Sequence, residues 1–180
     1  TIRFLPSLPA RVCVGLCLPK GADVLIKAAV GLPSNIQLHL VGSGGEEPAL
    51  RMFIEKNGLT GRVFLHGWKP REELAAYYRH SNLFVHPCRW PEPFGLVVAE
   101  ALRWGLPVIA TEKTGAAWIA GDAGITIRKG DADALRREIL GVYNSPEKRS
   151  ELANKAKERA RLFDAEAISK RFIAELELLA

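Results

Sequence analysis

The chain alternates short, almost wholly apolar segments with longer segments whose apolar residues recur at helical spacing. The apolar segments predict strands at residues 11–15, 36–41, 63–65, 83–85, 108–110 and 125–127. The periodic segments predict helices at residues 22–30, 46–56, 71–79, 95–104 and 114–120. Strands that alternate with helices over short connections form a parallel sheet, and wholly apolar strands suit burial on both faces. We therefore expect an α/β fold, a doubly wound parallel sheet of about six strands with helices on both faces.

The ends of the chain differ from this pattern. Residues 1–10 contain two prolines and have no clear period, which indicates a linker. The last part predicts C-terminal helices at residues 131–143, 147–163 and 165–179. Their apolar stripes favour packing on the sheet over docking of a partner, and they consist of Leu152, Ala156, Phe163, Ile168, Phe172, Leu176 and Leu179.

Composition narrows the class of protein. The 180 residues, 48% hydrophobic and 25% charged, suit one globular domain with a sizeable core. The net charge of +5 fits an anionic ligand, but no run of Lys and Arg is interleaved with aromatics, so we expect no nucleic acid. Three cysteines, an odd number, fit a reducing, cytoplasmic location. No signal peptide or membrane-length apolar run is evident, and the start at Thr1 predicts a processed or excised chain.

The stretch at residues 85–111 is the strongest candidate for a site. Glu92-Pro93-Phe94-Gly95 follows a strand and leads into a helix that carries Glu100. Open α/β sheets bind ligands beyond the carboxyl ends of their strands, and helix N–H groups there attract anions. The two glutamates should be about 10 Å apart, which matches the span of a nucleoside-diphosphate sugar. The alternative is a solvent-facing helix with two ordinary glutamates.

Other motifs have simpler explanations. Gly42-Ser43-Gly44-Gly45 follows a strand without the G-x-G-x-x-G spacing, and the acidic Glu46-Glu47 would oppose a phosphate. A tight turn that lines a pocket with backbone is favoured there. Asp131-Ala132-Asp133 precedes a helix, so N-capping is favoured over metal binding. Lys20-Gly21 lies at the same sheet edge as Glu92, where anion contact and simple solvation stay equally open.

Cysteines and histidines show no complete metal or catalytic set. Cys13 and Cys17 lack a second pair of ligands, and the histidines are scattered over strand and helix ends. Core or surface roles are the default for these residues, which include His39, His66, His80 and His86.

Taken in order, the motifs resemble the C-terminal, donor-binding half of GT-B glycosyltransferases of the family 4 type. The resemblance runs from Arg11 to Ala180. Its most specific part is Glu-x7-Glu with Phe-Gly between the glutamates, followed by Gly105-x-Pro107-Val108. The remaining motifs are Lys20-Gly21, Leu25-Ile26-x-Ala28, Leu40-Val41-Gly42-x-Gly44 and Val63-Phe64-Leu65-x-Gly67.

The resemblance implies roles for these positions. Glu92 and Lys20 would be catalytic: Glu92 would hold hydroxyls of the donor hexose, and Lys20 would neutralise the leaving diphosphate. Glu100 would hold the ribose. Backbone N–H groups at residues 94–96 would bind phosphate or sugar oxygens, and the loop at Gly67 would lie beside the base. The full implied donor-binding set is Gly15, Lys20, Gly42, Gly44, Gly67, Trp68, Glu92, Pro93, Phe94, Gly95, Leu96 and Glu100.

Three positions depart from the family pattern. Leu16 stands where an Arg is usual, Cys88 where a Ser is common, and Trp118 where a Glu is usual. These departures bear on phosphate affinity and on the sugar side of the pocket, not on the fold.

The resemblance also implies how the reaction is divided. Residues 1–180 would be a single domain that takes a UDP-, GDP- or ADP-sugar without a metal or other cofactor. The hexose would pass with retention to a glycan, lipid or small-molecule acceptor bound by an N-terminal domain that this chain lacks. Peripheral membrane contact would belong to the full enzyme. The alternatives are a non-catalytic nucleotide-sugar binding or regulatory module and a nucleotide-sugar epimerase-like half domain.

Overall fold

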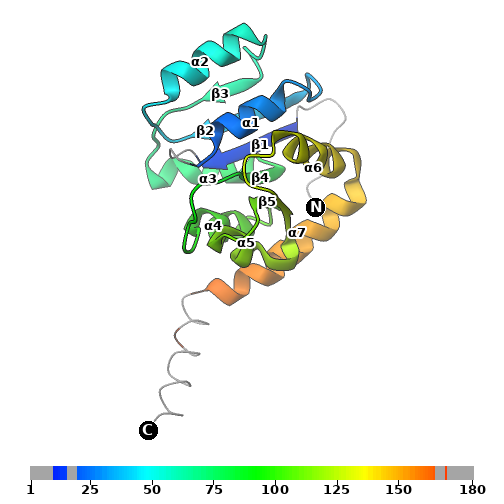
Figure 1. The fold of residues 1–180 in the computed structure, drawn as a ribbon. Coiled ribbons are helices and arrows are strands. Elements are labelled where there is room, and N and C mark those ends of the chain that lie inside the picture. Colours follow the sequence, from blue (N-terminus) through cyan, green and yellow to red (C-terminus); the bar gives the residue numbers. More distant parts are fainter. Residues whose placement is uncertain (1–9, 16–19, 165–168, 170–180) are drawn as a thin grey trace.

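The computed structural model describes residues 10–15, 20–164 and 169, and its centre is a parallel sheet of six strands (Figure 1). The strand order is β3-β2-β1-β4-β5-β6, and every neighbouring pair is parallel. The strands are β1 (Ala10–Gly15), β2 (Ile36–Val41), β3 (Val63–Leu65), β4 (Leu83–His86), β5 (Val108–Thr111) and β6 (Gly124–Ile127). The predicted doubly wound sheet is confirmed.

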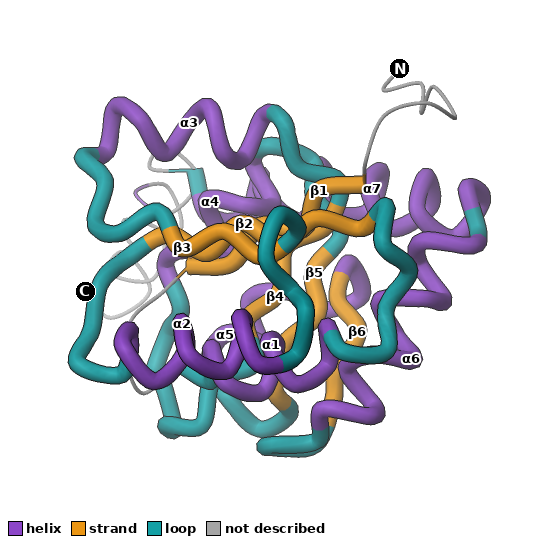
Figure 2. The backbone as a smooth tube through the Cα atoms, turned by 90° about the horizontal axis from the view of Figure 1, so that it is seen from above, coloured by secondary structure: helices purple, strands orange, loops and turns teal. Residues whose placement is uncertain are grey.

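Helices cover both faces of this sheet, as predicted (Figure 2). One face carries α1 (Ala22–Ala29), α2 (Glu47–Lys56) and α6 (Ala132–Asn144). The other carries α3 (Arg71–Arg79), α4 (Leu96–Arg103), α5 (Gly115–Ala120) and α7 (Pro146–Ala160). Two short 3-10 turns, η1 (Gly121–Ala123) and η2 (Arg161–Phe163), complete the described elements.

Each face has its own apolar core. The central strands β4 and β5 are buried at every position, which explains why they read as continuous apolar runs. Side chains of β4 alternate between the cores: Val85 faces the α1 side and Phe84 the α4 side. The stripe on α7 was expected to pack on the sheet, but α7 instead packs chiefly against the helical elements α4, η1, η2 and α6.

Local signals account for several helix ends. Asp131 caps α6 by accepting a hydrogen bond from the Ala134 backbone N–H at 2.7 Å, which confirms the capping interpretation. Ser145 caps α7 in the same way, through the N–H of Lys148. The linker predicted at the N-terminus lies almost wholly outside the described residues, and so do Leu16 and nearly all of the helix predicted at 165–179.

Two further findings concern the bounds of the strands and the capacity of the helices to cross a membrane. Strands β1, β4, β5 and β6 are each one residue longer than predicted, so His86 ends β4 and Thr111 ends β5. None of the described helices combines the length and the apolar character that crossing a bilayer requires.

Candidate functional site

The strand order reverses between β1 and β4, and the loops after these two strands meet at the carboxyl edge of the sheet. Gly21, which precedes α1, has φ of +76° and lies directly against the exit of β4. A Cβ atom at Gly21 would come 2.0 Å from the backbone oxygen of Pro87. Only glycine fits there without a shift of the backbone, so the Lys-Gly motif is what allows α1 to start against β4.

This contact brings Lys20 to Glu92, a residue 72 positions later in the chain. The ammonium Nζ of Lys20 lies 2.5 Å from Oε1 of Glu92. The other carboxylate oxygen, Oε2, lies 2.5 Å from Nε2 of His86 at the end of β4. His86 is fully buried, whereas the side chains of Lys20 and Glu92 are 24% and 17% exposed. The carboxylate and the ammonium are therefore partly exposed at the edge of the sheet, whereas the imidazole is covered.

Charge at this cluster follows from burial and from the neighbours. Burial raises the pKa of Glu92, but the hydrogen bond from Lys20 and the interactions with His86 outweigh it, and the net pKa is lowered. Burial lowers the pKa of His86, and Lys20 lowers it further, against the opposing effect of Glu92. At neutral pH the site thus holds an ionised Glu92, a cationic Lys20 and a neutral imidazole that donates its Nε2–H to the carboxylate.

The loop between Glu92 and α4 is anchored from α5. The backbone N–H of Gly115 donates to the carbonyl of Glu92 at 2.8 Å. A Cβ atom at Gly115 would come 2.2 Å from the carbonyl oxygen of Pro93, so the two backbones are in close contact. Phe94 and Leu96 are exposed beside this anchor. The first N–H groups of α4, which no helix can pair internally, are therefore held at the same edge as Lys20.

Glu100 lies one turn further along α4, in different surroundings. Its carboxylate accepts a hydrogen bond from the hydroxyl of Tyr78 on α3 at 3.0 Å. It lines a pocket of about 340 Å³ between α3 and α4 that also includes Arg71 and Arg103. The structure thus brings Lys20 and Glu92 together, and it places Glu100 against α3.

The predicted glycines lie at the same edge of the sheet, where β1, β2 and β3 end. Gly15 is the last residue of β1 and is paired with Val41. The N–H of Gly42 donates to the carbonyl of Gly67 at 2.7 Å, which fastens the exit loops of β2 and β3 to each other. The carbonyl of Gly44 accepts the N–H of Glu47 where α2 starts. Trp68 is 72% exposed beside this bridge.

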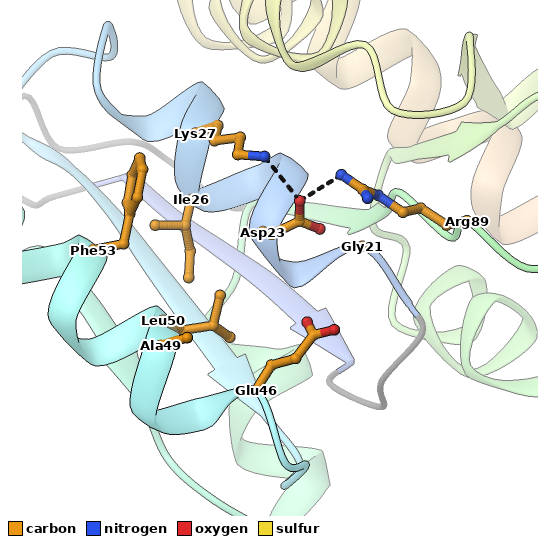
Figure 3. Close-up of a pocket in the computed structure, with 9 residues that line it drawn as sticks. All are labelled: Gly21, Asp23, Ile26, Lys27, Glu46, Ala49, Leu50, Phe53 and Arg89. Atoms are coloured by element: carbon orange, nitrogen blue, oxygen red, sulfur yellow. Dashed lines mark hydrogen bonds and ion pairs between the residues drawn. The ribbon is translucent and has the colours of Figure 1, made fainter.

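A pocket of about 330 Å³ lies between α1 and α2 at this edge (Figure 3). Its apolar floor comes from both helices. Asp23 at its rim binds Lys27 at 3.2 Å and also binds Arg89, which reaches across from the β4 exit loop. Sequence reasoning missed Arg89, although a cation in the loop after a strand that ends at a candidate site was a usable signal.

Sequence reasoning also missed the neighbours of Glu92 within its own loop. The ligand-capable atoms of His86, Cys88 and Glu92 all lie within 4.8 Å of one another. Cys88 is buried, its thiol donates to the Trp90 carbonyl at 3.2 Å, and burial raises its pKa. The usable signal was the H-x-C-x3-E spacing at the end of a strand.

Comparison with known proteins identifies the family to which the chain belongs. The profile described as "Glycosyl transferases group 1" matches residues 12–159. The lipopolysaccharide core biosynthesis glycosyltransferase LpsE of Rhizobium meliloti is 32% identical over 89% of this chain and 46% of its own length. A GDP-mannose-dependent α-(1-6)-phosphatidylinositol monomannoside mannosyltransferase of Mycolicibacterium smegmatis is 29% identical over 79% of this chain and 40% of its own.

A solved structure is similar over almost the whole chain. HepE of Anabaena in complex with UDP-glucose superposes with a TM-score of 0.84 at 26% identity, covering 94% of this chain and 49% of HepE. The chain spans about half the length or less of these three proteins. On the profile match and the shared fold, the chain belongs to the glycosyl transferases group 1 family.

Proposed function

We propose that this chain binds a nucleoside-diphosphate sugar at the switch point between β1 and β4. In this proposal it is the donor-binding half of a retaining glycosyltransferase. The observation that carries the proposal is the contact of Lys20 with Glu92 where α1 and α4 begin. Two helix N-termini and an ammonium group suit a diphosphate, and the carboxylate beside them suits sugar hydroxyls. Similarity to HepE, whose complex holds UDP-glucose, supports this ligand class.

The chemistry requires stabilisation of a leaving group. When the bond between the sugar C1 and the β-phosphate oxygen breaks, its electron pair stays on the phosphate. Lys20 and the N–H groups at the start of α4 would stabilise that charge. Glu92 would accept hydroxyls of the hexose, Glu100 would accept those of the ribose, and the Gly67 loop with Trp68 would lie beside the base. No metal is needed, because these groups already provide positive charge.

The acceptor belongs to the rest of the enzyme in this proposal. A glycan, lipid or small molecule would be held by an N-terminal domain, and the hexose would pass between the two halves with retention. Peripheral contact with a membrane would arise in the same full-length protein. The names of the relatives include lipopolysaccharide core and phosphatidylinositol mannoside enzymes, which supports a glycan or lipid acceptor.

Calorimetric titration of the 180-residue chain with UDP-, GDP- and ADP-sugars tests the proposal. We expect at least one donor to bind, with the same affinity in the presence of a chelator. Lys20→Ala should weaken it about 10- to 100-fold, since a charged hydrogen bond contributes about 1.5–3 kcal/mol. Glu100→Ala should also weaken it.

Lys155→Ala is the matched control, because Lys155 pairs with Glu151 at 2.6 Å on α7, outside the site. The control should bind the donor as the wild type does. If a folded chain binds none of the donors, the proposed donor site is wrong. If a donor binds but the full-length protein neither transfers nor hydrolyses it, the non-catalytic alternative replaces the enzyme.

A further inference from the structure

Three chemically different metal ligands meet beside the proposed donor site. His86 offers an imidazole nitrogen, Cys88 a sulfur and Glu92 a carboxylate oxygen, and all three atoms lie within 4.8 Å of one another. They come from one loop and from the strand that it leaves. His86 and Cys88 are buried with relative exposures of 0% and 1%, so the backbone and the core hold two of the three ligands in place.

The donor set selects the kind of ion. Nitrogen, sulfur and oxygen ligands together suit the borderline-soft Zn²⁺, whereas Mg²⁺ and Ca²⁺ prefer oxygen alone. Zinc bonds to these atoms are about 2.0–2.3 Å long, so ligands around tetrahedral zinc lie about 3–4 Å apart. The carboxylate and imidazole, now 2.5 Å apart, would separate slightly, and the sulfur would approach. Zinc binding requires both of these movements, and water would complete the fourth position.

Occupation by an ion conflicts with the existing ion pair. Glu92 now holds Lys20 at 2.5 Å, and a divalent cation on the same carboxylate repels that ammonium. Lys20 would therefore leave Glu92 when zinc binds. The Cys88 thiol would release its proton to solvent and lose its hydrogen bond to the Trp90 carbonyl. The His86 proton would move from Nε2 to Nδ1 by exchange with water, which frees Nε2 for the ion.

The support around the ligands indicates a reversible site. The Nδ1 atom of His86 is buried and has no hydrogen-bond partner within residues 10–15, 20–164 and 169. A zinc-binding histidine usually donates its second ring N–H to an acceptor, and loss of that acceptor costs about 10- to 100-fold in metal affinity. The site is therefore expected to be weaker than a structural zinc site and to exchange its ion.

We propose that His86, Cys88 and Glu92 form a Zn²⁺ site whose occupation excludes the nucleotide-sugar donor. Exclusion follows because the ion takes the carboxylate intended for the sugar and displaces the ammonium intended for the diphosphate. This exclusion rests on the proposed function, but the binding of zinc does not. The ion is an inhibitor and not a cofactor of the transfer.

Metal binding is tested first, on the 180-residue chain with Zn²⁺ alone and with Co²⁺ as a spectroscopic probe. We expect about one Zn²⁺ per chain and a thiolate-to-cobalt charge-transfer band. Cys88→Ser, which carries the residue common in the family, should remove the band and weaken zinc binding by more than about tenfold. His80→Asn is the control, since His80 is exposed at the end of α3. A band that persists in Cys88→Ser, or an equal loss in His80→Asn, would overturn the site.

Competition is tested second, by donor titration with and without zinc. At a free Zn²⁺ concentration ten times its dissociation constant, competition should raise the apparent donor Kd about tenfold in the wild type. Zinc should change the donor affinity of Cys88→Ser only a little. The same variant measures how much of the effect comes from zinc that binds to the diphosphate of the donor and not to the protein. Zinc binding with unchanged donor affinity would overturn the exclusion. Absence of donor binding to either protein would instead count against the proposed function and leave the metal test intact.

Discussion

Glu92 and Glu100 are eight residues apart in the chain, yet the structure gives them different surroundings. Glu92 lies between an ammonium and an imidazole, at the switch point between the neighbouring strands β1 and β4. Glu100 lies on α4 against α3, where its hydrogen bond comes from the neutral hydroxyl of Tyr78. The motif alone presents them as an equivalent pair of carboxylates.

The difference in partners separates their physical roles. A carboxylate that holds an ammonium depends on charge, so protonation or a competing cation disrupts it. A carboxylate that accepts from a hydroxyl keeps most of that contact when an amide replaces it. The Glu92 region should therefore respond to charge, to ions and to the packing that brings Lys20 close. The Glu100 region should respond mainly to the loss of one neutral hydrogen bond.

The largest effect should come from breaking the packing that creates the Glu92 region. Gly21→Ala adds a Cβ 2.0 Å from the Pro87 backbone oxygen at a residue with φ of +76°. We expect unfolding to become easier by about 2–5 kcal/mol, the sum of left-handed strain and overpacking. Urea denaturation measures the loss.

Gly58→Ala provides the matched comparison for that substitution. Gly58 has φ of +64°, but an added Cβ would have nothing within 4 Å. Its cost should be only the strain, about 1–2 kcal/mol. Equal costs for the two glycines would mean that the close approach of α1 to β4 contributes nothing.

A smaller effect is expected when Glu92 loses its charge. Glu92→Gln should lower the free energy of unfolding at pH 7 by about 1–3 kcal/mol, because a charged hydrogen bond becomes a neutral one. The pKa of Glu92 in the folded chain lies below the ordinary value of 4.5. The stability due to its ionisation is therefore complete above pH 4.5 and is lost as the pH falls from there through the lowered folded pKa.

Denaturation of wild type and Glu92→Gln across this acidic range measures the difference. The stability advantage of the wild type should shrink steadily below pH 4.5. An advantage that stayed constant from neutral to acidic pH would mean that the ion pair does not stabilise the fold.

The smallest effect should come from the Glu100 region. Tyr78→Phe removes the hydroxyl that donates to Glu100 and keeps the ring, which packs 5.8 Å from the Phe84 ring between centroids. We expect a loss of about 0.5–1.5 kcal/mol by thermal or urea unfolding, as for a neutral hydrogen bond. A cost greater than that of Glu92→Gln would reverse the comparison between the two regions.

Much of the fold could be predicted because its signals are local. Apolar runs placed the six strands, and helical periodicity placed the helices from α1 to α6 to within one residue at each end. The helix predicted at 147–163 instead ends at Ala160 and continues as the 3-10 turn η2. Asp131 was identified as a cap because the side chain acts on its own backbone three residues away. The 3-10 turn at Gly121–Ala123 was not predicted, since it has no periodicity to read.

The site was predictable in its residues but not in its contacts. Lys20 and Glu92 were singled out by motif and by their position at strand ends. Their mutual ion pair was not, because the sequence places both residues at one sheet edge but does not fix the distance between side chains 72 residues apart. His86 was given a core or surface role and Cys88 was noted only as a departure from the usual Ser, since burial and ligand geometry are properties of the folded loop.

By itself, the sequence determined a parallel α/β sheet, the edge at which its loops converge and the polar residues carried there. Periodicity and capping act between near neighbours, so they can be read without a fold. Only the tertiary structure decided that Glu92 meets Lys20, His86 and Cys88 while Glu100 meets Tyr78. Those partners depend on how helices pack across strands, because small shifts in the relative position of packed elements change which charges pair.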